Sequence, residues 1–479
     1  MTQGILPVYR EIPFGCPCRI YENLRAPKSF LFESVKGPEN IARYSFIGID
    51  PYLEFTVRDG IFEIEVNGKK TISSRKPLDR LKELLSCYQQ TPVAGLPPFQ
   101  GGAAGVFNYD FVKYLERLPC NAVDDLGLPD AHFLMIDRLI AFDHHEQKAW
   151  IIVCPGARET VLGYSEINGS PEKYSDDAET ILDDIFNKIS LIRVRDTVHT
   201  ENKKGIIIHY DVSKETYIGM VKRAKEYIAA GDIFQANLSL RVSADITNYD
   251  PWEIYRILRE INPSPFASYA DFGAYQIVSS SPERLVRVID GTVDTRPIAG
   301  TRPRGQNIGE DDRMRRELLL NEKERAEHIM LIDLERNDIG RVAEYGSVRV
   351  DELMLTEDYS HVIHIVSNVE GKLAEGKDCF DVVKAVYPGG TITGVPKVRC
   401  MEIIDELEPF RRGPYTGSLG YIGFNGCMDL NIIIRTFLVK DGNAYIQAGA
   451  GIVADSDPER EYEECIKKAE ALLRTLERL

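Results

Sequence analysis

The sequence has no long apolar run and no excess of positive charge. Its longer apolar stretches, such as residues 149–154, have the length of a strand, whereas a membrane-spanning helix needs about 18 to 20 apolar residues. The 58 Lys and Arg residues stand against 74 Asp and Glu residues, which gives a formal net charge of −16. Because binding along a nucleic-acid backbone needs a basic surface, the composition argues against nucleic-acid binding as well as against a membrane protein.

The sequence also lacks the features of a secreted or a zinc-binding protein. Residues 1–5 contain neither the basic segment nor the apolar run of a signal peptide, and nine cysteines are scattered along the chain. The one close pair, Cys16 and Cys18, has no second pair or histidine cluster that would complete a zinc site. We therefore expect reduced thiols and a cytoplasmic location.

The composition is that of a globular protein, with 43% hydrophobic and 28% charged residues among 479. A chain of this length predicts more than one domain. In residues 1–160, Asp59-Gly60 and Asn67-Gly68 separate alternating runs as hairpin turns do, which predicts an N-terminal β-rich domain. A polar stretch at 161–204 predicts a linker, and 205–479 would form the second domain.

The second predicted domain mixes helices with antiparallel strands. Ser213 and Gly231 bracket a helical pattern, while Asp290-Gly291 and Asp441-Gly442 mark hairpins within 285–298 and 430–452. Further helical patterns cover residues 308–334, 377–386, 396–406 and 458–478. Because helices and strands come in blocks without regular strand–helix alternation, the sequence predicts an α+β fold rather than a parallel doubly wound sheet.

Two of the predicted helices carry glutamates three residues apart, on one face of each helix. Glu461 and Glu464 share a face with Lys468 near the C-terminus, and Glu324 and Glu327 form the other pair. Taken alone, the C-terminal set is typical of a solvated face with an ordinary Glu464/Lys468 ion pair. Two such pairs also provide the carboxylate oxygens that Mg²⁺ prefers, and no His or Cys cluster stands at zinc-ligand spacing.

Five short motifs follow one another in a recognisable order. They are Ser281-Pro282-Glu283, Arg296-Pro297-Ile298-Ala299-Gly300-Thr301, Asp333-Leu334-Glu335-Arg336-Asn337-Asp338, 359–367 and 447–452. This series resembles the chorismate-utilising enzymes: anthranilate synthase component I, aminodeoxychorismate synthase component I, isochorismate synthase and salicylate synthase. The resemblance covers about residues 210–475 as the chorismate-binding domain and extends to 30–34 and 43–48. It implies the fold of anthranilate synthase component I, with antiparallel β-sheets packed as a sandwich and surrounded by helices.

The resemblance implies a magnesium-dependent site that binds chorismate. Glu327 and Glu464 match the Mg²⁺ ligands, with Glu324 and Glu461 adjoining them, and the ion would hold the ring carboxylate of the substrate. The positions that match substrate-binding residues are Gly300, Thr301, Tyr415, Arg435, Gly449, Ala450, Gly451 and Lys468.

Two further positions match groups that act on the substrate. His364 corresponds to the active-site histidine beside the leaving hydroxyl, and Glu283 corresponds to a general acid or base. Thr301 and Gly300 resemble the pair that contacts the ring. Arg435 offers a planar fork suited to bidentate carboxylate binding, as an acidic protein with a dianionic substrate needs.

Gln235 and Ala299 bear on the choice of nucleophile. The water-using members carry a lysine where this sequence has Gln235, and glutamine cannot serve as a general base, so we expect ammonia to be the nucleophile. The sequence has no Gly-x-Cys-x-Gly elbow of a glutamine amidotransferase, and ammonia would therefore come from a partner amidotransferase subunit. Ala299 is the form typical of anthranilate synthase, whereas many aminodeoxychorismate synthases place a nucleophilic lysine there.

The other markers of the product conflict with Ala299. The segments 333–338, 388–394 and 262–267 look more like aminodeoxychorismate synthase, including its lysine-free bacterial form. On balance the sequence predicts formation of 4-amino-4-deoxychorismate, a precursor of 4-aminobenzoate and folate. The alternative is anthranilate synthase component I, which converts chorismate to anthranilate and pyruvate for tryptophan synthesis.

A second set of residues resembles the tryptophan pocket of feedback-inhibited members. The set is Leu31, Glu33, Ser34, Asn262, Pro263, Ser264, Pro265 and Phe266. The next residue is Ala267, where the feedback-inhibited type tends to have a larger Met. We expect packing or a retained tryptophan here rather than regulation. A non-enzymatic, effector-binding homologue is the remaining alternative, and the presence of Glu327, Glu464, His364 and Lys468 argues against it.

Overall fold

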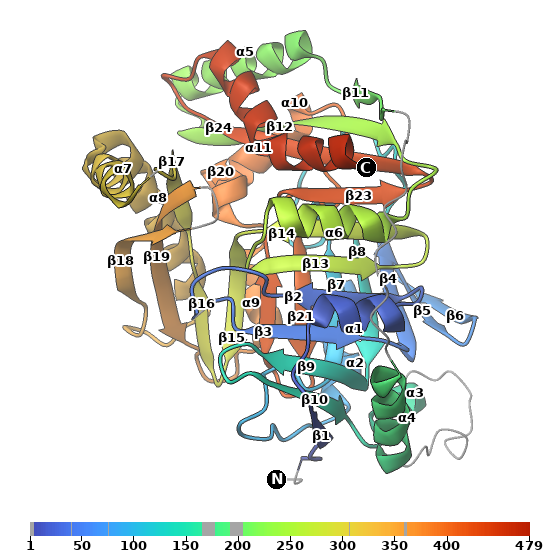
Figure 1. Ribbon diagram of the computed structural model, residues 1–479. Coiled ribbons are helices and arrows are strands. Elements are labelled where there is room, and N and C mark those ends of the chain that lie inside the picture. The colour runs from blue at the N-terminus through green and yellow to red at the C-terminus, as the bar shows by residue number, and fades with distance from the viewer. Residues whose placement is uncertain are drawn as a thin grey trace.

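Two large antiparallel β-sheets organise the chain, as a computed structural model shows (Figure 1). The structure describes residues 4–39, 41–74, 76–164, 178–191, 205–305, 307–358 and 362–479. The sheets pack face to face: the ring of Phe46 in one sheet meets that of Tyr421 in the other at 5.3 Å between centroids. With helices around the sheets, this is the α+β sandwich that the sequence predicted.

Within the described residues, each sheet has twelve strands. In spatial order the first contains β1 (Val8–Ile12), β10 (Lys148–Val153), β9 (Arg138–Asp143), β3 (Tyr44–Gly48), β2 (Ser29–Glu33), β13 (Phe266–Asp271), β14 (Tyr275–Ser281), β23 (Thr436–Lys440), β24 (Asn443–Ile452), β12 (Gln235–Asp245) and β11 (Ile208–Tyr210), with β20 (Gly394–Val395) beside β12. The second contains β17 (Ile298–Pro303), β19 (Val362–Lys372), β16 (Thr292–Thr295), β15 (Arg284–Ile289), β22 (Met428–Asn431), β21 (Ser418–Gly423), β7 (Gly102–Phe107), β8 (Ala131–Ile136), β4 (Leu53–Arg58), β5 (Ile61–Val66) and β6 (Lys69–Ser73), with β18 (Arg349–Asp358) beside β19.

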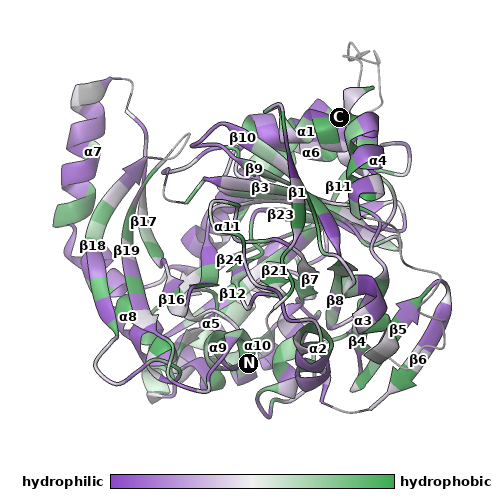
Figure 2. Ribbon diagram, turned by 90° about the horizontal axis from the view of Figure 1, so that it is seen from below, coloured by the Kyte–Doolittle hydropathy of each residue, from purple (hydrophilic) through white to green (hydrophobic). Residues whose placement is uncertain are grey.

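The helices cover the outer faces and one end of the sandwich. They are α1 (Pro17–Leu24), α2 (Pro77–Ser86), α3 (Ala157–Tyr164), α4 (Ala178–Ser190), α5 (Lys214–Ala230), α6 (Pro251–Ile261), α7 (Ile308–Leu320), α8 (Glu322–Gly340), α9 (Cys379–Val386), α10 (Lys397–Leu407) and α11 (Pro458–Arg478), with short 3₁₀ turns η1 (Tyr109–Tyr114) and η3 (Gly390–Ile392). Figure 1 shows α1 and α6 across the first sheet, and Figure 2 shows α7 and the β5–β6 hairpin at opposite ends of the molecule.

Both sheets are shared between the two predicted domains. In the first sheet β2 pairs with β13, and in the second β7 pairs with β21. The division into 1–160 and 205–479 therefore divides the chain but not the hydrophobic core, which continues across both junctions.

The predicted linker is only partly within the described residues. Residues 165–177 and 192–204 lie outside them, whereas the expected helical pattern between these segments forms α4. Its buried side chains Ile181, Leu182 and Ile185 join the main core, and Arg10 of β1 donates to Asp183 at 2.7 Å. This part of the predicted linker is thus packed against the first sheet.

The turn and cap signals located four hairpins and the starts of two helices correctly. Asp59, Asn67, Asp290 and Asp441 all have φ between 49° and 50°, and the glycine that follows each is also left-handed, as two-residue hairpins require. The Ser213 and Asp457 side chains accept from backbone N–H groups at the starts of α5 and α11.

Two predicted boundaries were wrong. The pattern at 308–334 forms two helices, because the backbone of Asn321 ends α7 while its side chain caps α8 by accepting from the Glu324 N–H at 3.0 Å. The predicted hairpin from 430 to 452 begins only at Thr436, because Leu430 belongs to β22 of the other sheet. The chain changes sheets at Arg435, whose φ is +51°.

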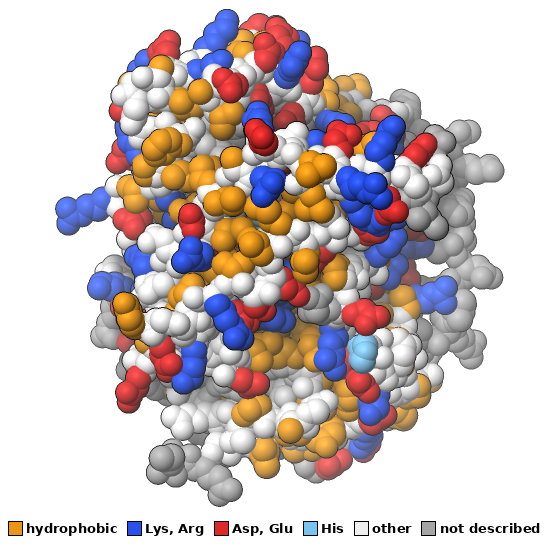
Figure 3. All heavy atoms as spheres, turned by 90° about the vertical axis from the view of Figure 1, so that its left-hand side faces the viewer, with side chains coloured by type: hydrophobic (Ala, Val, Ile, Leu, Met, Phe, Trp, Pro, Cys, Tyr) orange, Lys and Arg blue, Asp and Glu red, His pale blue; other side chains and the backbone are white. Residues whose placement is uncertain are grey.

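The surface over α7, α8 and β18 carries charges of both signs. Figure 3 shows hydrophobic side chains gathered along the middle of this face, with acidic and basic side chains interspersed among them. Exposed apolar residues of these elements include Leu320, Leu353 and Leu355. Within the described part of the chain, no helix is long and apolar enough to cross a membrane.

Candidate active site

The first wall of the site is the edge where β12 pairs with β24. Asn237 pairs with Gly451 and Ser239 pairs with Gly449 in this ladder. A Cβ at Gly449 would lie 2.7 Å from the Tyr415 hydroxyl, and a Cβ at Gly451 would overlap the side-chain amide of Gln235. Glycine is required at both positions because polar side chains lie directly on the strand.

Lys468 connects this strand to α11. Its Nζ donates to the Gly449 carbonyl at 3.0 Å and lies 2.9 Å from Glu464 Oε1. The ion pair expected of a solvated helix face is therefore present. The same ammonium also reaches the glycine strand, which places a cation beside the predicted substrate-binding backbone.

The second wall comes from the other sheet, where β17 pairs with β19. The His364 Nδ1 lies 3.1 Å from the Gly300 carbonyl, and Thr301 pairs with His364 in the backbone ladder. Gly300 has a φ of +61°, and a Cβ there would lie 2.6 Å from Glu324 Oε2. The predicted ring-contacting segment thus lies against both the histidine and one of the predicted metal-site glutamates. Ala299, next to it, is buried.

His364 is a neutral imidazole in this setting. Because a carbonyl oxygen can only accept, Nδ1 carries the hydrogen and donates it to Gly300. Burial and the nearby Arg435 guanidinium lower the pKa of His364 to about 4. The histidine therefore presents Nε2 as its lone-pair nitrogen at neutral pH.

Glu283 lies in the turn between β14 and β15 and is only 7% exposed. Burial raises the pKa of this carboxyl to about 7, against the opposing effects of a hydrogen bond from Thr391 and of the Arg435 and Lys468 charges. The Thr391 Oγ1 donates to Glu283 Oε1 at 3.1 Å. A carboxyl with a pKa near neutrality can both give and take a proton, as a general acid or base must.

Sequence reasoning missed Thr391. Its only sequence signal was the glycine-rich run 389–394, which resembles no established phosphate-binding spacing. In the structure this run forms η3, and its Thr393 carbonyl accepts from the Asn237 N–H at 2.9 Å. The run therefore ties Glu283 to the strand that carries Gln235.

The four glutamates of the predicted metal site lie on α8 and α11. The pKa of Glu327 is raised by burial and then by Glu324, and the pKa of Glu461 is raised by burial, with Glu464 adding to it. Lys323 and Lys468 act on both Glu327 and Glu461, so the two helices face a common space. Glu324, Glu327 and Glu461 are half-buried and Glu464 is exposed. A hard divalent cation relieves repulsion between neighbouring carboxylates, so this donor set fits Mg²⁺ in its chemistry.

The metal-site carboxylates are nevertheless paired with cations. Arg302 lies 3.0 Å from Glu324, and Lys468 lies 2.9 Å from Glu464. Across the described ranges, no three acidic, His or Cys side chains converge as a ready metal cage. Mg²⁺ binding would therefore require these side chains to rearrange.

Gln235 is held between the two walls. Its Nε2 donates to Glu327 Oε1 at 3.5 Å, which assigns the other amide atom as the acceptor Oε1. Within the described part of the chain, the buried oxygens Gln235 Oε1 and Asn237 Oδ1 have no hydrogen-bond partner. Two buried acceptors thus lie at the start of β12. No hydrogen bond from the described protein offsets the free-energy cost of removing them from water.

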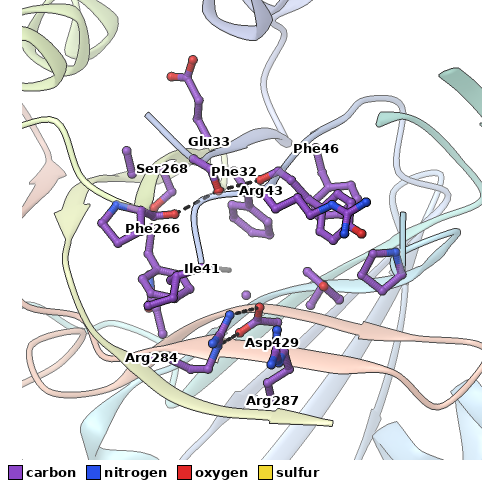
Figure 4. Close-up of a pocket in the computed structure, with 18 of the residues that line it drawn as sticks. Phe32, Glu33, Ile41, Arg43, Phe46, Phe266, Ser268, Arg284, Arg287 and Asp429 are labelled. Carbon is purple, nitrogen blue, oxygen red and sulfur yellow. Dashed lines mark hydrogen bonds and ion pairs between the residues drawn. The ribbon is translucent and has the colours of Figure 1, made fainter. Parts of the chain in front are cut away.

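Four of the predicted tryptophan-pocket residues border a separate cavity of about 560 Å³ between the sheets (Figure 4). Glu33, Ser34, Pro265 and Phe266 line it together with Ala267. On the opposite wall Arg284 pairs with Asp429, its Nε lying 2.9 Å from Oδ1. A void of this size is large enough to hold a small ligand.

The other predicted pocket residues do not border this cavity. Leu31 belongs to the core on the far side of β2, because neighbouring side chains of a strand point to opposite faces. Glu33 is among the lining residues, but Figure 4 shows its side chain pointing away from the cavity. The Glu33 carboxylate accepts from Arg259 at 2.7 and 2.8 Å.

Residues 262–264 instead form hydrogen bonds that hold the turn between α6 and β13 in place. Asn262 Nδ2 donates to Ser280 at 2.9 Å, and the Ser264 carbonyl accepts from the Val35 N–H at 3.0 Å. Pro263 lies between them in the same turn. The segment holds Pro265 and Phe266 in place at the cavity wall.

Residues 28–474 match the family model described as "chorismate binding enzyme". This chain belongs to that family. It is 45% identical over 483 residues to anthranilate synthase component 1 of Acetivibrio thermocellus, covering 99% of this chain and 96% of the relative. It is 43% identical over 476 residues to aminodeoxychorismate synthase component 1 of Bacillus subtilis, covering 98% and 97%.

The family fold is also seen in solved structures. Anthranilate synthase component I from Streptococcus pneumoniae TIGR4 is 38% identical and superposes with a TM-score of 0.76, covering 89% of this chain and 91% of that one. The predicted fold is thereby confirmed, and this chain is a chorismate-utilising enzyme. Relatives with either product are similar to it at comparable identity over the full length.

Proposed function

We propose that this enzyme aminates chorismate with ammonia and forms 4-amino-4-deoxychorismate. The observation that carries the amination is Gln235, which stands where water-using members have a lysine. Its amide donates to Glu327 and leaves Oε1 as a buried acceptor beside Asn237 Oδ1. Such acceptors suit the N–H groups of ammonia, whose lone pair needs no general base to generate it. The motifs at 333–338 and 388–394 support the aminodeoxychorismate product.

The protein's own groups account for substrate binding and proton transfer. Arg435 and Lys468 supply positive charge beside Glu283, where the two carboxylates of chorismate need it. Glu283 would protonate the departing 4-hydroxyl and take a proton from the incoming ammonium group, since its pKa lies near 7. Neutral His364 would accept a hydrogen bond from that hydroxyl at Nε2 and keep it oriented.

Magnesium is part of this proposal. Glu327 and Glu464 would hold the ion, with Glu324 and Glu461 adjoining, and the bound ion would neutralise the ring carboxylate. Carboxylate ligands with open positions for substrate are the usual arrangement for Mg²⁺.

Ammonia would come from a separate glutamine amidotransferase. The relatives are named component 1, which implies a second component in their assemblies. This sequence has no Gly-x-Cys-x-Gly elbow with which to hydrolyse glutamine.

Anthranilate formation is the second candidate function. Ala299 favours it, because this buried residue of β17 occupies the place of the nucleophilic lysine of many aminodeoxychorismate synthases. Anthranilate synthase component 1 of Thermus thermophilus, 47% identical over 455 residues, is a further relative of this type.

Product identification separates the two candidates. The enzyme is supplied with chorismate, ammonium and Mg²⁺, with and without a lyase that converts aminodeoxychorismate to 4-aminobenzoate. We expect 4-aminobenzoate only when the lyase is present. Fluorescent anthranilate in the absence of lyase selects the second candidate, and no consumption of chorismate rejects both.

A further inference from the structure

Arg412 and Glu408 form a buried ion pair outside the groups described so far. They are 3% and 4% exposed, and Glu408 stands at the end of α10, which packs beside β12 (Figure 1). The guanidinium binds the carboxylate in a bidentate manner, with Nε 2.9 Å from Oε2 and Nη2 2.7 Å from Oε1. Neither residue belongs to the substrate, metal or proton-transfer groups named above.

The other donors of Arg412 reach three different segments of the chain. Its Nη2 donates to the Asn237 carbonyl at 2.7 Å, and its Nη1 donates to the Ile392 carbonyl at 3.1 Å and to Thr416 Oγ1 at 3.2 Å. A guanidinium carries five N–H groups, so with the two contacts to Glu408 every one of them is used. One planar group thereby holds the start of β12, η3 and the turn that precedes β21.

Each of these segments carries a group of the proposed reaction. The start of β12 carries the buried acceptor oxygens of Gln235 and Asn237. The 3₁₀ turn η3 carries Thr391, which donates to Glu283 at 3.1 Å. The turn before β21 carries Tyr415, whose ring centroid lies 5.5 Å from the central carbon of the same guanidinium. A displacement of any one segment would therefore move a group that the reaction uses.

The contact with Thr416 fixes the backbone next to Tyr415. The Thr416 hydroxyl donates its single hydrogen to the Tyr415 carbonyl at 2.6 Å, so it accepts from Arg412. Thr416 has a φ of +60°, a conformation that β-branched residues rarely adopt, and its N–H donates to the Ile433 carbonyl at 2.8 Å. These hydrogen bonds hold the turn in a conformation that it would not favour alone.

Glu408 extends the same network along β12. Its Oε1 accepts from the N–H and from the hydroxyl of Ser239, both at 2.8 Å. Ser239 pairs with Gly449, whose carbonyl accepts from Lys468. The ion pair therefore holds β12 at a second residue, beside one of the predicted substrate-binding glycines.

We propose that Arg412 is a positioning residue for the reaction, which sets the start of β12, η3 and the Tyr415 turn relative to one another. The inference rests on the proposed function, which gives the groups on these segments their roles. An ion pair with Glu408 needs only two of the five donors, and a lysine could supply it. The three other contacts account for an arginine, because an ammonium has only three hydrogens and no planar fork.

The first test replaces Arg412 by Lys, which keeps a cation beside Glu408 but cannot make all five contacts. We expect kcat to fall by about 10- to 100-fold and KM for chorismate to rise by about threefold or more, because the displaced groups lose their alignment with the substrate. Steady-state rates at saturating ammonium measure both.

The matched control is Arg241→Lys. Arg241 is also buried, lies on the same strand β12, and pairs with the carboxylates of Asp211 at 2.7 Å and Asp125 at 2.5 Å. Its partners carry none of the groups assigned to the reaction. The variant should lower the midpoint of urea unfolding while kcat and KM stay within about twofold of wild type.

The second test measures binding without turnover. Chorismate is titrated calorimetrically with Mg²⁺ present and ammonium absent, and the affinity should weaken by about threefold or more in Arg412→Lys but not in Arg241→Lys. Thr416→Ala removes a single partner of Arg412 and should weaken the affinity in the same direction. Thr416→Ser, which keeps the hydroxyl, should bind as wild type does.

Three results overturn the inference. The first is a folded Arg412→Lys variant whose kcat and chorismate affinity stay within twofold of wild type. The second is an equal loss of affinity in Arg412→Lys and Arg241→Lys, which would leave Arg412 a general stabilising role only. If Arg412→Lys does not fold, wild-type affinity of Thr416→Ala is the third. A wild-type chain that binds chorismate but does not aminate it contradicts the proposed function, while the affinities still decide the role of Arg412.

Discussion

At the scale of single residues, the site contains a buried carboxyl group whose pKa is raised, with cations nearby that we propose bind the substrate. Glu283 is the clearest case. Replacing it by Gln should lower kcat by roughly 10²- to 10⁴-fold, because the variant can neither give nor take a proton. The pH–rate limb near 7 should vanish with it. A pH series of ammonium-dependent turnover measures both, with exposed Glu375→Gln as the control.

The Glu283→Gln variant should also change how the unfolding free energy depends on pH. Folding raises the pKa of Glu283 from 4.5 to about 7, so the folded state holds a proton that the unfolded chain releases in this window. The unfolding free energy of wild type therefore falls as pH rises through it. In Glu283→Gln the loss between pH 4.5 and 7.5 should shrink by on the order of 3 kcal/mol, measured by urea unfolding. An equal pH dependence in both proteins would mean that Glu283 is not desolvated.

Gln235 and Ala299 are the positions at which the nucleophile can be changed. Gln235→Lys should allow some attack by water and yield detectable isochorismate, because a buried lysine with a lowered pKa can act as a base. Gln235→Met, which offers neither a base nor a donor, is the control and should form none. Chromatography with mass detection identifies the products.

Ala299→Lys tests the covalent route. A lysine at this buried position of β17 should form an adduct with the ring or change the product ratio, seen as a chorismate-derived mass increment on the peptide that contains residue 299. If neither this variant nor Gln235→Lys changes the chemistry, these positions do not select the nucleophile.

Some of these residues could be predicted from local sequence patterns and others could not, for a physical reason. The Glu464/Lys468 pair could be predicted because both lie on one helix face, four residues apart. Thr391 could not, because its hydrogen bond to Glu283 joins segments distant in the chain. The roles of Glu327 and His364 came from resemblance to the family, and no local pattern would have assigned them.

At the scale of elements, α8 and α11 carry the four glutamates of the proposed metal site. Converting Glu327 or Glu464 to Gln should abolish turnover at millimolar Mg²⁺ and weaken Mn²⁺ binding by roughly tenfold or more, because each change removes a charged oxygen ligand. Calorimetric titration of Mn²⁺ provides the readout that does not depend on turnover. Glu470→Gln on α11, where Glu470 pairs with Arg474 at 2.7 Å, is the matched control. Full activity of both variants would reject the metal assignment.

Element boundaries were predictable wherever a turn or cap residue marks them. Asp-Gly and Asn-Gly dipeptides located four hairpins because their left-handed backbone needs those residues. The change of sheet before β23 has no such mark. It depends on Arg435 adopting a φ of +51° amid tertiary contacts, one of which is a hydrogen bond from the Ser280 N–H to its carbonyl. An apolar run alone cannot show which of two sheets it joins.

At the scale of the whole molecule, the cavity between the sheets is separate from the catalytic chemistry. We expect L-tryptophan to raise Tm by about 2 °C or more without lowering the rate of chorismate consumption. The reason is Ala267, which lines the cavity where feedback-inhibited members tend to have a larger Met. Thermal melts and rate assays at the same concentrations measure both effects, with glycine as the control ligand. Inhibition at concentrations that raise Tm would show regulation instead.

Turnover by this chain should depend on ammonia rather than glutamine. Turnover by the purified protein should rise with pH as NH₃ becomes populated, and glutamine should support it only after an amidotransferase subunit is added. The absence of a nucleophilic cysteine elbow is the reason. Coupled measurement of chorismate loss and glutamate release checks this, and glutamate release by the isolated chain would contradict it.

The sharing of both sheets between the two halves of the chain has a consequence for biosynthesis. β2 pairs with β13, where Glu33 lies opposite Ala267, and β7 pairs with β21, where Phe107 lies opposite Ser418. Neither pair can form until the second half of the chain has been synthesised. While the ribosome is still adding the second half, the nascent first half therefore carries two open strand edges with apolar faces, and unpaired edges invite association with other chains. Such distant pairings also slow folding. We expect yield in a heterologous host to improve when translation is slowed or chaperones are supplied, and the first half expressed alone to be insoluble.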